Sequence, residues 1–403
     1  MLGGNVQRDY ITKDKASSPM AYTEAVILTA VADAKEERKV ATVDLPNAFC
    51  QTVITDADAQ HRIIVRLRGA LVDMLVKIAP EVYGPYVTVN KKGEKVLLVQ
   101  CMNALYGSMV ASLMFYKKLA KALISYGFVY NPYDSCVANK VVEGETTTIC
   151  HHVDDCKISH VSEKVVDNII SLLKEDFKII FEDGSGSMQV RRGDTHVYVG
   201  MTLDYSHRGQ VRISMIKHVD DIIETFEKAQ STFDRGIIKA KSKRKSRSSS
   251  QVTAALKNLF DVNKECKALQ DSDREAFHKV VAKALYVAKR ARPDISTAIS
   301  FLTKRVLQPN REDWEKLEHM IRYLEATSKM PLILSADDSD CLYWYADSVF
   351  AVHPNFRSHN GAGLTLGRGF AISISSGQKL NTGSSTHAEL VCVSDILPMS
   401  QWV

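Results

Sequence analysis

The chain has 403 residues, of which 45% are hydrophobic and 25% are charged. These proportions are typical of a globular protein, and they exclude a collagen-like chain and a long disordered one. The length favours two or three domains. Lysine and arginine total 52 against 47 acidic residues, so the formal net charge is +5. This excess hints at an anionic partner without establishing one.

Eight cysteines are spread along the chain without any Cys-x-x-Cys pair, which predicts reduced thiols in an intracellular protein. The N-terminal residues lack the apolar core of a signal peptide. The longest apolar stretch, residues 25–32, is far too short to cross a bilayer, so no membrane partner is expected.

Residue periodicity predicts a mixed α and β chain. In the first half, apolar residues at helical spacing predict helices at 19–33, 111–126 and 164–177, and one beginning at 219–226. Residues that favour strands predict them at 39–49, 96–99, 197–204 and 210–216, with a hairpin at 146–159. In the second half we expect helices at 274–290, 295–307 and 312–328, a strand at 341–346, a hairpin at 361–375 and a helix at 386–403.

A basic run separates the two halves. Six of the nine residues at 239–247 are basic, and no acidic residue occurs between Asp234 and Asp261. The six are Lys239, Lys241, Lys243, Arg244, Lys245 and Arg247. Without them the net charge of the chain is 5 − 6 = −1, so the basicity belongs to this run. We interpret it as an exposed linker, and phosphate binding and nuclear localisation are open alternatives.

Three aspartates could form a metal site. Asp44 ends one predicted strand, and Asp154 and Asp155 lie in the middle of the predicted hairpin. Mg²⁺ prefers oxygen ligands, and paired carboxylates suit two ions that stabilise the attacking and leaving oxygens of a phosphoryl displacement. The alternative is a solvated turn, but strand-forming residues flank the aspartates on both sides.

Seven motifs in order give a specific resemblance that covers nearly the whole chain. They are ATVDLPNAFCQ, NALYGS, HHVDD, YVGMTLDY, the pair LYVAKRARPDISTAISFL and DWEKLEHMIRYLEAT, YADSVFA, and SSTHAEL. The chain resembles the reverse transcriptase and ribonuclease H region of a copia-type LTR retrotransposon polyprotein.

The resemblance implies an α+β fold, a right-hand polymerase followed by an incomplete ribonuclease H-like α/β domain. A fingers fragment and palm would span 1–205, and the thumb would begin at 206–235. The basic linker would span 236–268, the helical thumb or connection 269–335, and the truncated ribonuclease H-like domain 336–403.

The implied activity is that of an RNA-directed DNA polymerase, which extends a DNA primer on an RNA template with dNTPs. Asp44 and Asp154 would hold two Mg²⁺ ions, or Mn²⁺, and Asp155 would complete the triad. Phe49 would exclude a ribose 2′-hydroxyl by steric clash. The remaining implied contacts are Tyr106 and Gly107 at the nucleotide, His152 at the primer end, and either Lys174 or Lys178 as a proton donor.

A second carboxylate pair falls in the C-terminal part. The resemblance makes Asp347 and Glu389 the first two metal ligands of ribonuclease H, and it gives Asp395 no catalytic role. An alternative remains open for Glu389, because Thr386-x-x-Glu389 also matches a capping box at a helix start.

The chain departs from the family pattern at several places. His152 replaces an aromatic residue, Val110 stands in a segment that differs after Gly107, and an upstream basic segment is lacking. We expect the metal triad to persist with weak or absent polymerase activity. Because the chain ends before two further carboxylates of the family, we expect no RNA cleavage. The alternative is a catalytically decayed remnant that only binds nucleic acid.

The resemblance also implies an RNA–DNA hybrid as ligand, and the integrase and protease of the same polyprotein as partners. The expected location is the cytoplasm, in a virus-like particle, with nuclear entry as an open question. A competing reading is a zinc site in Cys150-His151-His152-Val153-Asp154-Asp155-Cys156. Neighbouring strand residues point to opposite faces, which argues against convergence on one ion.

Overall fold

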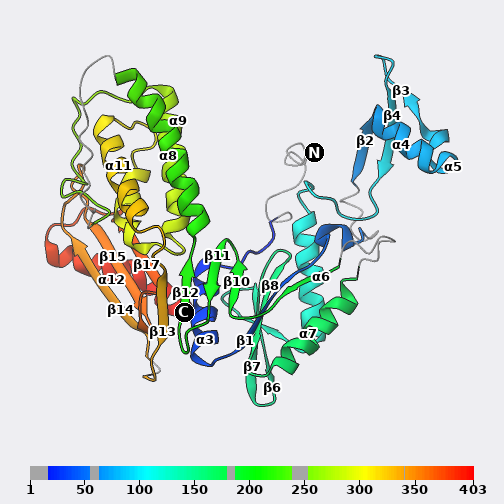
Figure 1. The fold of residues 1–403 in the computed structure, drawn as a ribbon, viewed down its shortest axis with the longest axis horizontal. Helices are drawn as coiled ribbons and strands as arrows, with labels where there is room; N and C mark the ends of the chain where they lie inside the picture. Colours follow the sequence, from blue (N-terminus) through cyan, green and yellow to red (C-terminus); the bar gives the residue numbers. More distant parts are fainter. Residues whose placement is uncertain (1–16, 55–62, 179–186, 238–252, 340) are drawn as a thin grey trace. The chain divides into compact units, whose positions relative to one another are not determined.

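The computed structural model describes residues 17–54, 63–178, 187–237, 253–339 and 341–403 (Figure 1). The chain divides into two compact units. The first unit comprises Met1–Ala21 and Ala41–Arg191, and the second comprises Tyr22–Val40 and Arg192–Val403. The basic run at 239–247 lies outside the described residues. The predicted limits of fingers, palm, thumb and connection stay predictions.

The first unit is built on a six-stranded sheet that places the predicted hairpin at its centre. In spatial order its strands are β5 (Val129–Tyr130), β6 (Val137–Val142), β7 (Glu145–His152), β8 (Asp155–His160), β1 (Lys39–Asp44) and β9 (Gln189–Arg191). The predicted hairpin is confirmed, since β7 and β8 pair antiparallel with His152 opposite Asp155. The strand predicted at 39–49 ends at Asp44, and a 3-10 turn, η1 (Ala48–Gln51), follows.

Two helices, α6 (Ala111–Ser125) and α7 (Glu163–Asp176), form one core with this sheet (Figure 1). The α6 side chains Phe115, Leu119 and Leu123 recur every four residues, so they share one helix face, and all are fully buried. Burying each such side chain stabilises the fold by roughly 1.5–3 kcal/mol. The core fixes β1 and the β7–β8 hairpin, and with them the positions of the aspartates.

Residues 63–100 form a smaller substructure. Of its elements, the sequence patterns predicted only the strand at 96–99. Its three strands pair in the order β2 (Ile64–Arg68), β4 (Lys95–Gln100) and β3 (Thr88–Val89). Its helices are α4 (Ala70–Ile78), α5 (Pro80–Tyr83) and the 3-10 turn η3 (Gly84–Tyr86).

The second unit contains a five-stranded sheet and a group of helices. The strands, in spatial order, are β10 (Thr195–Tyr198), β11 (Met201–Asp204), β12 (Val211–Ser214), β13 (Leu332–Ala336) and β16 (Gly367–Arg368). The helices are α3 (Thr23–Lys35), α8 (Ile216–Ile237), α9 (Asp271–Ala288), η4 (Pro293–Ile295), α10 (Ser296–Thr303) and α11 (Arg311–Ala326). Because α3 packs against β12 and β13, a distant N-terminal segment completes this unit.

The strand predicted at 197–204 is wrong in one respect, because the segment folds back on itself as β10 and β11. Val199 and Gly200 turn the chain with φ values of 49° and 78°. A Cβ at Gly200 would lie 2.8 Å from the Tyr286 hydroxyl, so glycine fits both the backbone and the space. A valine in the left-handed region is rare, and the pattern therefore gave no sign of this turn.

A third sheet in the second unit carries the C-terminal carboxylates. Its strands pair antiparallel in the order β14 (Tyr343–Val349), β15 (His359–Thr365) and β17 (Ile372–Gly377). Helix α12 (Ser385–Trp402) packs on β14 and β15. The predicted hairpin is confirmed, although Gly367 and Arg368 between its strands pair with β13 instead.

No disulfide links any of the eight cysteines, all of which lie in the described ranges. In the part of the chain that the structure describes, no helix is both long and apolar enough to span a membrane.

Candidate active site

The structure brings Asp44 and the hairpin aspartates to one place in the first unit. Asp44 is the last residue of β1, and β1 lies beside β8 in the sheet. The next residue, Leu45, donates its backbone N–H to the Asp154 carbonyl at 3.0 Å. Asp154 lies in the tight turn between β7 and β8, where Val153 adopts a positive φ of 59°. The turn therefore sets Asp154 and Asp155 beside the end of β1.

The carboxylates of this group, Asp44, Asp154 and Asp155, are electrostatically coupled. Burial raises the pKa of Asp154, and the negative charge of Asp44 raises it further. Burial also raises the pKa of Asp155, with Asp154 and Asp44 adding to the effect, to about 6. The charges of Asp44 and Asp154 thus make ionisation of Asp155 less favourable, and Asp44 has the same effect on Asp154. We call these three residues the hairpin carboxylates.

The hairpin carboxylates have few donors that would offset their charge. Within the described ranges no side chain donates a hydrogen bond to any of them, and only the backbone N–H of Asp154 bonds its own carboxylate. Arg191 in β9 lowers the pKa of Asp155 through its charge, although it does not cancel the rise. The sequence patterns did not identify Arg191 as part of this site. The only local indication was a pair of basic residues after a short β-forming segment.

A divalent cation fits this donor set chemically. Carboxylate oxygens are hard ligands, and a cation would relieve their mutual repulsion. Among the described residues, no group of three or more His, Cys, Asp or Glu side chains is already arranged to hold an ion. The fit therefore rests on charge and ligand chemistry at the hairpin carboxylates.

The two aromatic residues predicted to bind the nucleotide, Phe49 and Tyr106, contact each other. Phe49, in η1, lies with its ring centroid 4.7 Å from that of Tyr106 and 6.3 Å from that of Phe115. Burial raises the pKa of Tyr106, and Asp154 and Asp44 contribute through their charges, so this ring is near the carboxylates. Gly107 follows with φ of 90°, a conformation that favours glycine.

The other residues predicted for this site lie in mixed positions. His152 pairs in register with Asp155 across the hairpin, next to the carboxylates. Lys174 is exposed on α7 and Lys178 is exposed just beyond it. The structure gives no contact of either lysine with the hairpin carboxylates, so the choice between them remains open.

The residues of the zinc alternative are distributed through the sheet. Cys150, His151 and Cys156 are buried in β7 and β8. Nε2 of His151 lies 3.2 Å from the Tyr130 hydroxyl, and burial lowers the pKa of this histidine to about 4. These groups serve the packing of the strands.

The second carboxylate pair also comes together. Asp347 lies within β14 and Glu389 lies in α12. The backbone N–H of Ser348 donates to Oδ1 of Asp347 at 2.9 Å and to Oε1 of Glu389 at 3.3 Å. Asp395, which the sequence assigned no role, accepts a hydrogen bond of 2.9 Å from the Asn360 amide. We call Asp347, Glu389 and Asp395 the helix carboxylates.

The capping-box alternative for Glu389 is wrong. The N-cap of α12 is Ser384, whose hydroxyl accepts a 3.1 Å hydrogen bond from the His387 N–H. Thr386 is already inside the helix, and Glu389 lies beyond the capping position. Glu389 instead accepts from a strand residue, which ties the helix to β14.

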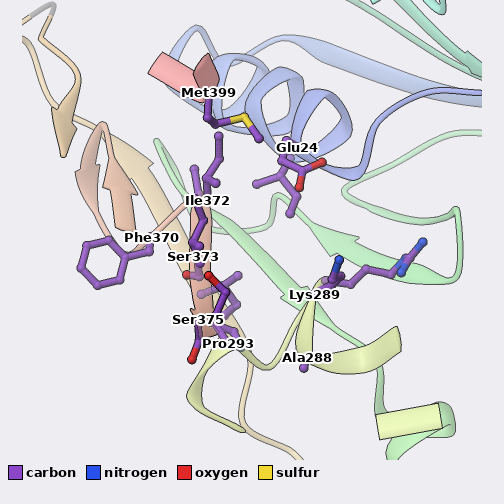
Figure 2. Close-up of a pocket in the computed structure, with 15 residues that line it drawn as sticks. Glu24, Ala288, Lys289, Pro293, Phe370, Ile372, Ser373, Ser375 and Met399 are labelled. Atoms are coloured by element: carbon purple, nitrogen blue, oxygen red, sulfur yellow. The ribbon is translucent and has the colours of Figure 1, made fainter. Parts of the chain in front are cut away.

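Away from both carboxylate groups, the second unit contains a cavity of about 300 Å³ (Figure 2). Its lining includes Glu24 from α3, Lys289 after α9, Ser373 and Ser375 from β17, and Met399 from α12. Neither the hairpin carboxylates nor the helix carboxylates contribute to it.

No family model matches the chain. It is 29% identical over 132 residues to a retrovirus-related Pol polyprotein from transposon RE2 of Arabidopsis thaliana, covering 32% of this chain and 9% of that one. It is 21% identical over 299 residues to a putative transposon Ty5-1 protein of Saccharomyces cerevisiae. This match covers 72% of this chain and 86% of the yeast protein. A foamy viral protease-reverse transcriptase solved with ds DNA shares 12% identity at a TM-score of 0.45, covering 92% of this chain and 50% of that one. The matched stretch is thus a small fraction of the Arabidopsis relative, and the predicted resemblance to retrotransposon polyproteins is confirmed.

Proposed function

Since its relatives are retrovirus-related Pol polyproteins of transposons, we propose that the chain is an RNA-directed DNA polymerase of a copia-type element. It would extend a DNA primer on an RNA template with dNTPs. The observation that carries this proposal is the convergence of Asp44, Asp154 and Asp155 at one end of the sheet, where their charges interact. The ordered motifs around these residues and the names of the relatives support it.

The hairpin carboxylates would hold two Mg²⁺ or Mn²⁺ ions, with Asp44 and Asp154 as the main ligands and Asp155 assisting. When bound, such ions stabilise charge on the attacking and leaving oxygens of a phosphoryl transfer. The chain's own residues orient the reactants around them. His152, which pairs with Asp155 across the hairpin, would contact the primer end, and the Phe49 ring would exclude an added 2′-hydroxyl by clash.

Phe49 and Tyr106 pack against each other in a tilted contact and would form an aromatic wall that faces the nucleotide. Tyr106 is 52% exposed, which leaves part of its ring available to a base or sugar. Phe49 also packs on Phe115, a fully buried residue of the sheet–helix core. The aromatic wall is therefore anchored in the same core that positions β1 and the hairpin.

A second candidate is a decayed remnant that binds nucleic acid without polymerising. His152 stands where the family has an aromatic residue, and Val110 lies in a segment that departs from the family motif. Val110 is buried in a small apolar cluster with Ile54 and Ile63, so it offers no hydrogen bond to a nucleotide. This candidate predicts hybrid binding with no dNTP incorporation.

Primer extension on poly(rA)/oligo(dT) with Mg²⁺ or Mn²⁺ tests the proposal. The informative variant is Asp154→Asn, which keeps the shape of the side chain and removes its negative charge. Asp338→Asn is a matched control, because Asp338 is an exposed aspartate of the second unit. Circular dichroism verifies that each variant is folded.

Extension that is lost in Asp154→Asn and retained in Asp338→Asn supports the polymerase. Hybrid binding without extension in the folded wild-type chain supports the decayed remnant. Extension that survives Asp154→Asn contradicts the assignment of the hairpin carboxylates.

A further inference from the structure

We propose that a second cavity of the second unit is a phosphate-binding site. Its volume is about 350 Å³, and its lining includes four basic side chains, Lys304, Arg305, Arg357 and Lys379. No aspartate or glutamate is among the lining residues. We call this space the basic cavity. The inference does not depend on the polymerase assignment, because the basic cavity contains none of the hairpin or helix carboxylates.

Three of the four cations lack a carboxylate partner. Within the residues that the structure describes, Lys304, Arg357 and Lys379 form no ion pair. Burial lowers the pKa of Lys304, and the charge of Arg357 lowers it further, so the two cations are close enough to repel. Placing like charges together without counter-ions costs free energy, and a bound anion would recover it.

Arg305 differs from the others because the fold fixes its orientation. Its Nε lies 3.0 Å from Oδ2 of Asp313, which is almost fully buried. Asp313 also belongs to the capping box of α11, where it accepts the Asn310 backbone N–H at 2.9 Å. The guanidinium is thus held at the cavity wall by a side chain that cannot easily move.

Two buried, neutral histidines, His353 and His359, connect to the Lys304 ammonium through polar contacts. Its Nζ lies 3.3 Å from Nε2 of His353, and that nitrogen lies 3.0 Å from Nδ1 of His359. An ammonium group only donates, so Nε2 of His353 faces Lys304 as an acceptor. Burial is the largest cause that lowers the pKa of both histidines, to about 4, and the charge of Lys304 contributes to both.

The histidine contacts orient Lys304 without neutralising it. His359 continues the chain of polar contacts to the Ser375 hydroxyl at 2.8 Å, so the assembly is connected to β17. The Phe260 ring packs against both imidazoles, with centroid separations of 4.9 Å and 5.1 Å. Gly377 allows the close approach, since a Cβ there would collide with the Lys304 ammonium.

The chemistry of the basic cavity favours a phosphate group over a monovalent anion. Several cationic donors on different elements can surround the oxygens of a tetrahedral, multiply charged ligand. Guanidinium groups such as that of Arg357 also form paired hydrogen bonds with phosphate. The phosphate could be free, as inorganic phosphate or pyrophosphate, or it could belong to a nucleic-acid backbone.

Calorimetric titration of the full chain tests the site with inorganic phosphate, pyrophosphate and an RNA–DNA hybrid as separate probes. The double variant Lys304→Gln/Arg357→Gln removes two cations of the cavity. The control Lys217→Gln/Lys329→Gln removes the same charge from two exposed lysines outside the cavity. Loss of two charge-assisted contacts should weaken binding at least about tenfold, while the control changes it little. Thermal melting of both variants verifies that they are folded.

Saturable pyrophosphate or phosphate binding that the cavity variant loses and the control keeps supports a site for free phosphate. Hybrid binding that only the cavity variant weakens, without binding of the free anions, supports a backbone phosphate as the ligand. The proposal is overturned if no probe binds, or if both variants weaken binding equally, because bulk charge would then explain the effect.

Discussion

The two carboxylate groups of the chain differ in what compensates their charge. The helix carboxylates receive hydrogen bonds from the protein, through the Ser348 backbone N–H and the Asn360 amide. Among the hairpin carboxylates, Asp154 accepts only its own backbone N–H, and no described side chain donates to any of the three. Burial together with neighbouring negative charge raises the pKa of Asp154 and Asp155. A carboxylate that already accepts N–H donors is stabilised without a cation, whereas an uncompensated group must take up a proton or a cation.

This difference predicts which site depends on metal. The hairpin carboxylates should respond strongly to divalent cations and to charge removal. The helix carboxylates should respond less, because protein donors remain when a cation is absent.

The largest contrast is expected between Asp44→Asn and Asp347→Asn. Replacing Asp44 removes a proposed metal ligand, and the rate of primer extension should fall at least about 100-fold, since even residues behind metal ligands contribute about 10–100-fold. Asp347 lies in the other carboxylate group, so its replacement should leave extension unchanged. Steady-state extension with Mg²⁺ measures both variants. Equal losses in the two would contradict the separation of the sites.

The hairpin should lose stability in acid because of His151. This buried histidine has a folded-state pKa of about 4, below its ordinary value of 6.5. A base with a depressed pKa binds protons mainly in the unfolded chain, so its contribution to stability is lost as the pH falls below 6.5. Between pH 7 and pH 5 the contribution of His151 to the free energy of unfolding should drop by about 2 kcal/mol. Asp155, whose raised pKa favours the folded chain in acid, offsets part of this drop in the wild type and in any His151 variant alike.

Urea unfolding at pH 7 and pH 5 measures this drop, with His151→Phe as the comparison. Phenylalanine cannot titrate and keeps an aromatic ring beside Tyr116 and Tyr130, whose centroids lie 5.8 Å and 5.9 Å from that of His151. The variant should show a smaller pH dependence whatever its stability at pH 7. A variant with the same acid sensitivity as the wild type would exclude His151 as the cause.

Magnesium itself should stabilise the first unit. At a concentration ten times its dissociation constant, an ion that binds only the folded chain stabilises it by about 1.4 kcal/mol. The corresponding rise in the melting temperature of a unit of this size is about 3–6 °C. Differential scanning calorimetry should show this rise in the wild type and in Glu389→Gln, and no rise in Asp154→Asn. If Glu389→Gln abolished the Mg²⁺-dependent rise in melting temperature, the principal metal site would be at the helix carboxylates instead.

The sequence predicted the hairpin carboxylates better than their surroundings, and the reason is the range of the interactions. The hairpin follows from β-forming residues on both sides of a short polar turn, which is local information. Arg191 lies 36 positions from Asp155 (191 − 155), and its effect depends on β9 joining the sheet beside β1. No local pattern encodes that pairing, just as none showed that α3 joins the second unit.

The basic cavity illustrates the same limit. Its four cations come from the residues just after α10, from the segment before β15 and from the residues just after β17. Each cation alone looks like an ordinary exposed lysine or arginine in the sequence. Their significance comes from tertiary placement, whereas the six basic residues of the conspicuous run at 239–247 lie outside the described residues.

The smallest contrast tests how the start of α12 supports the helix carboxylates. The sequence pattern offered Thr386 as the cap, whereas in the structure the Ser384 hydroxyl accepts the backbone N–H of His387. Ser384→Ala should therefore cost about 1 kcal/mol of stability, as loss of an N-cap typically does. Thr386→Ala, inside the helix, should change stability by less than about 0.5 kcal/mol. Urea unfolding of the two variants measures the difference. If Thr386→Ala lost more stability than Ser384→Ala, Thr386 would be the cap. Glu389 would then serve mainly in a capping box and not in the contact with β14.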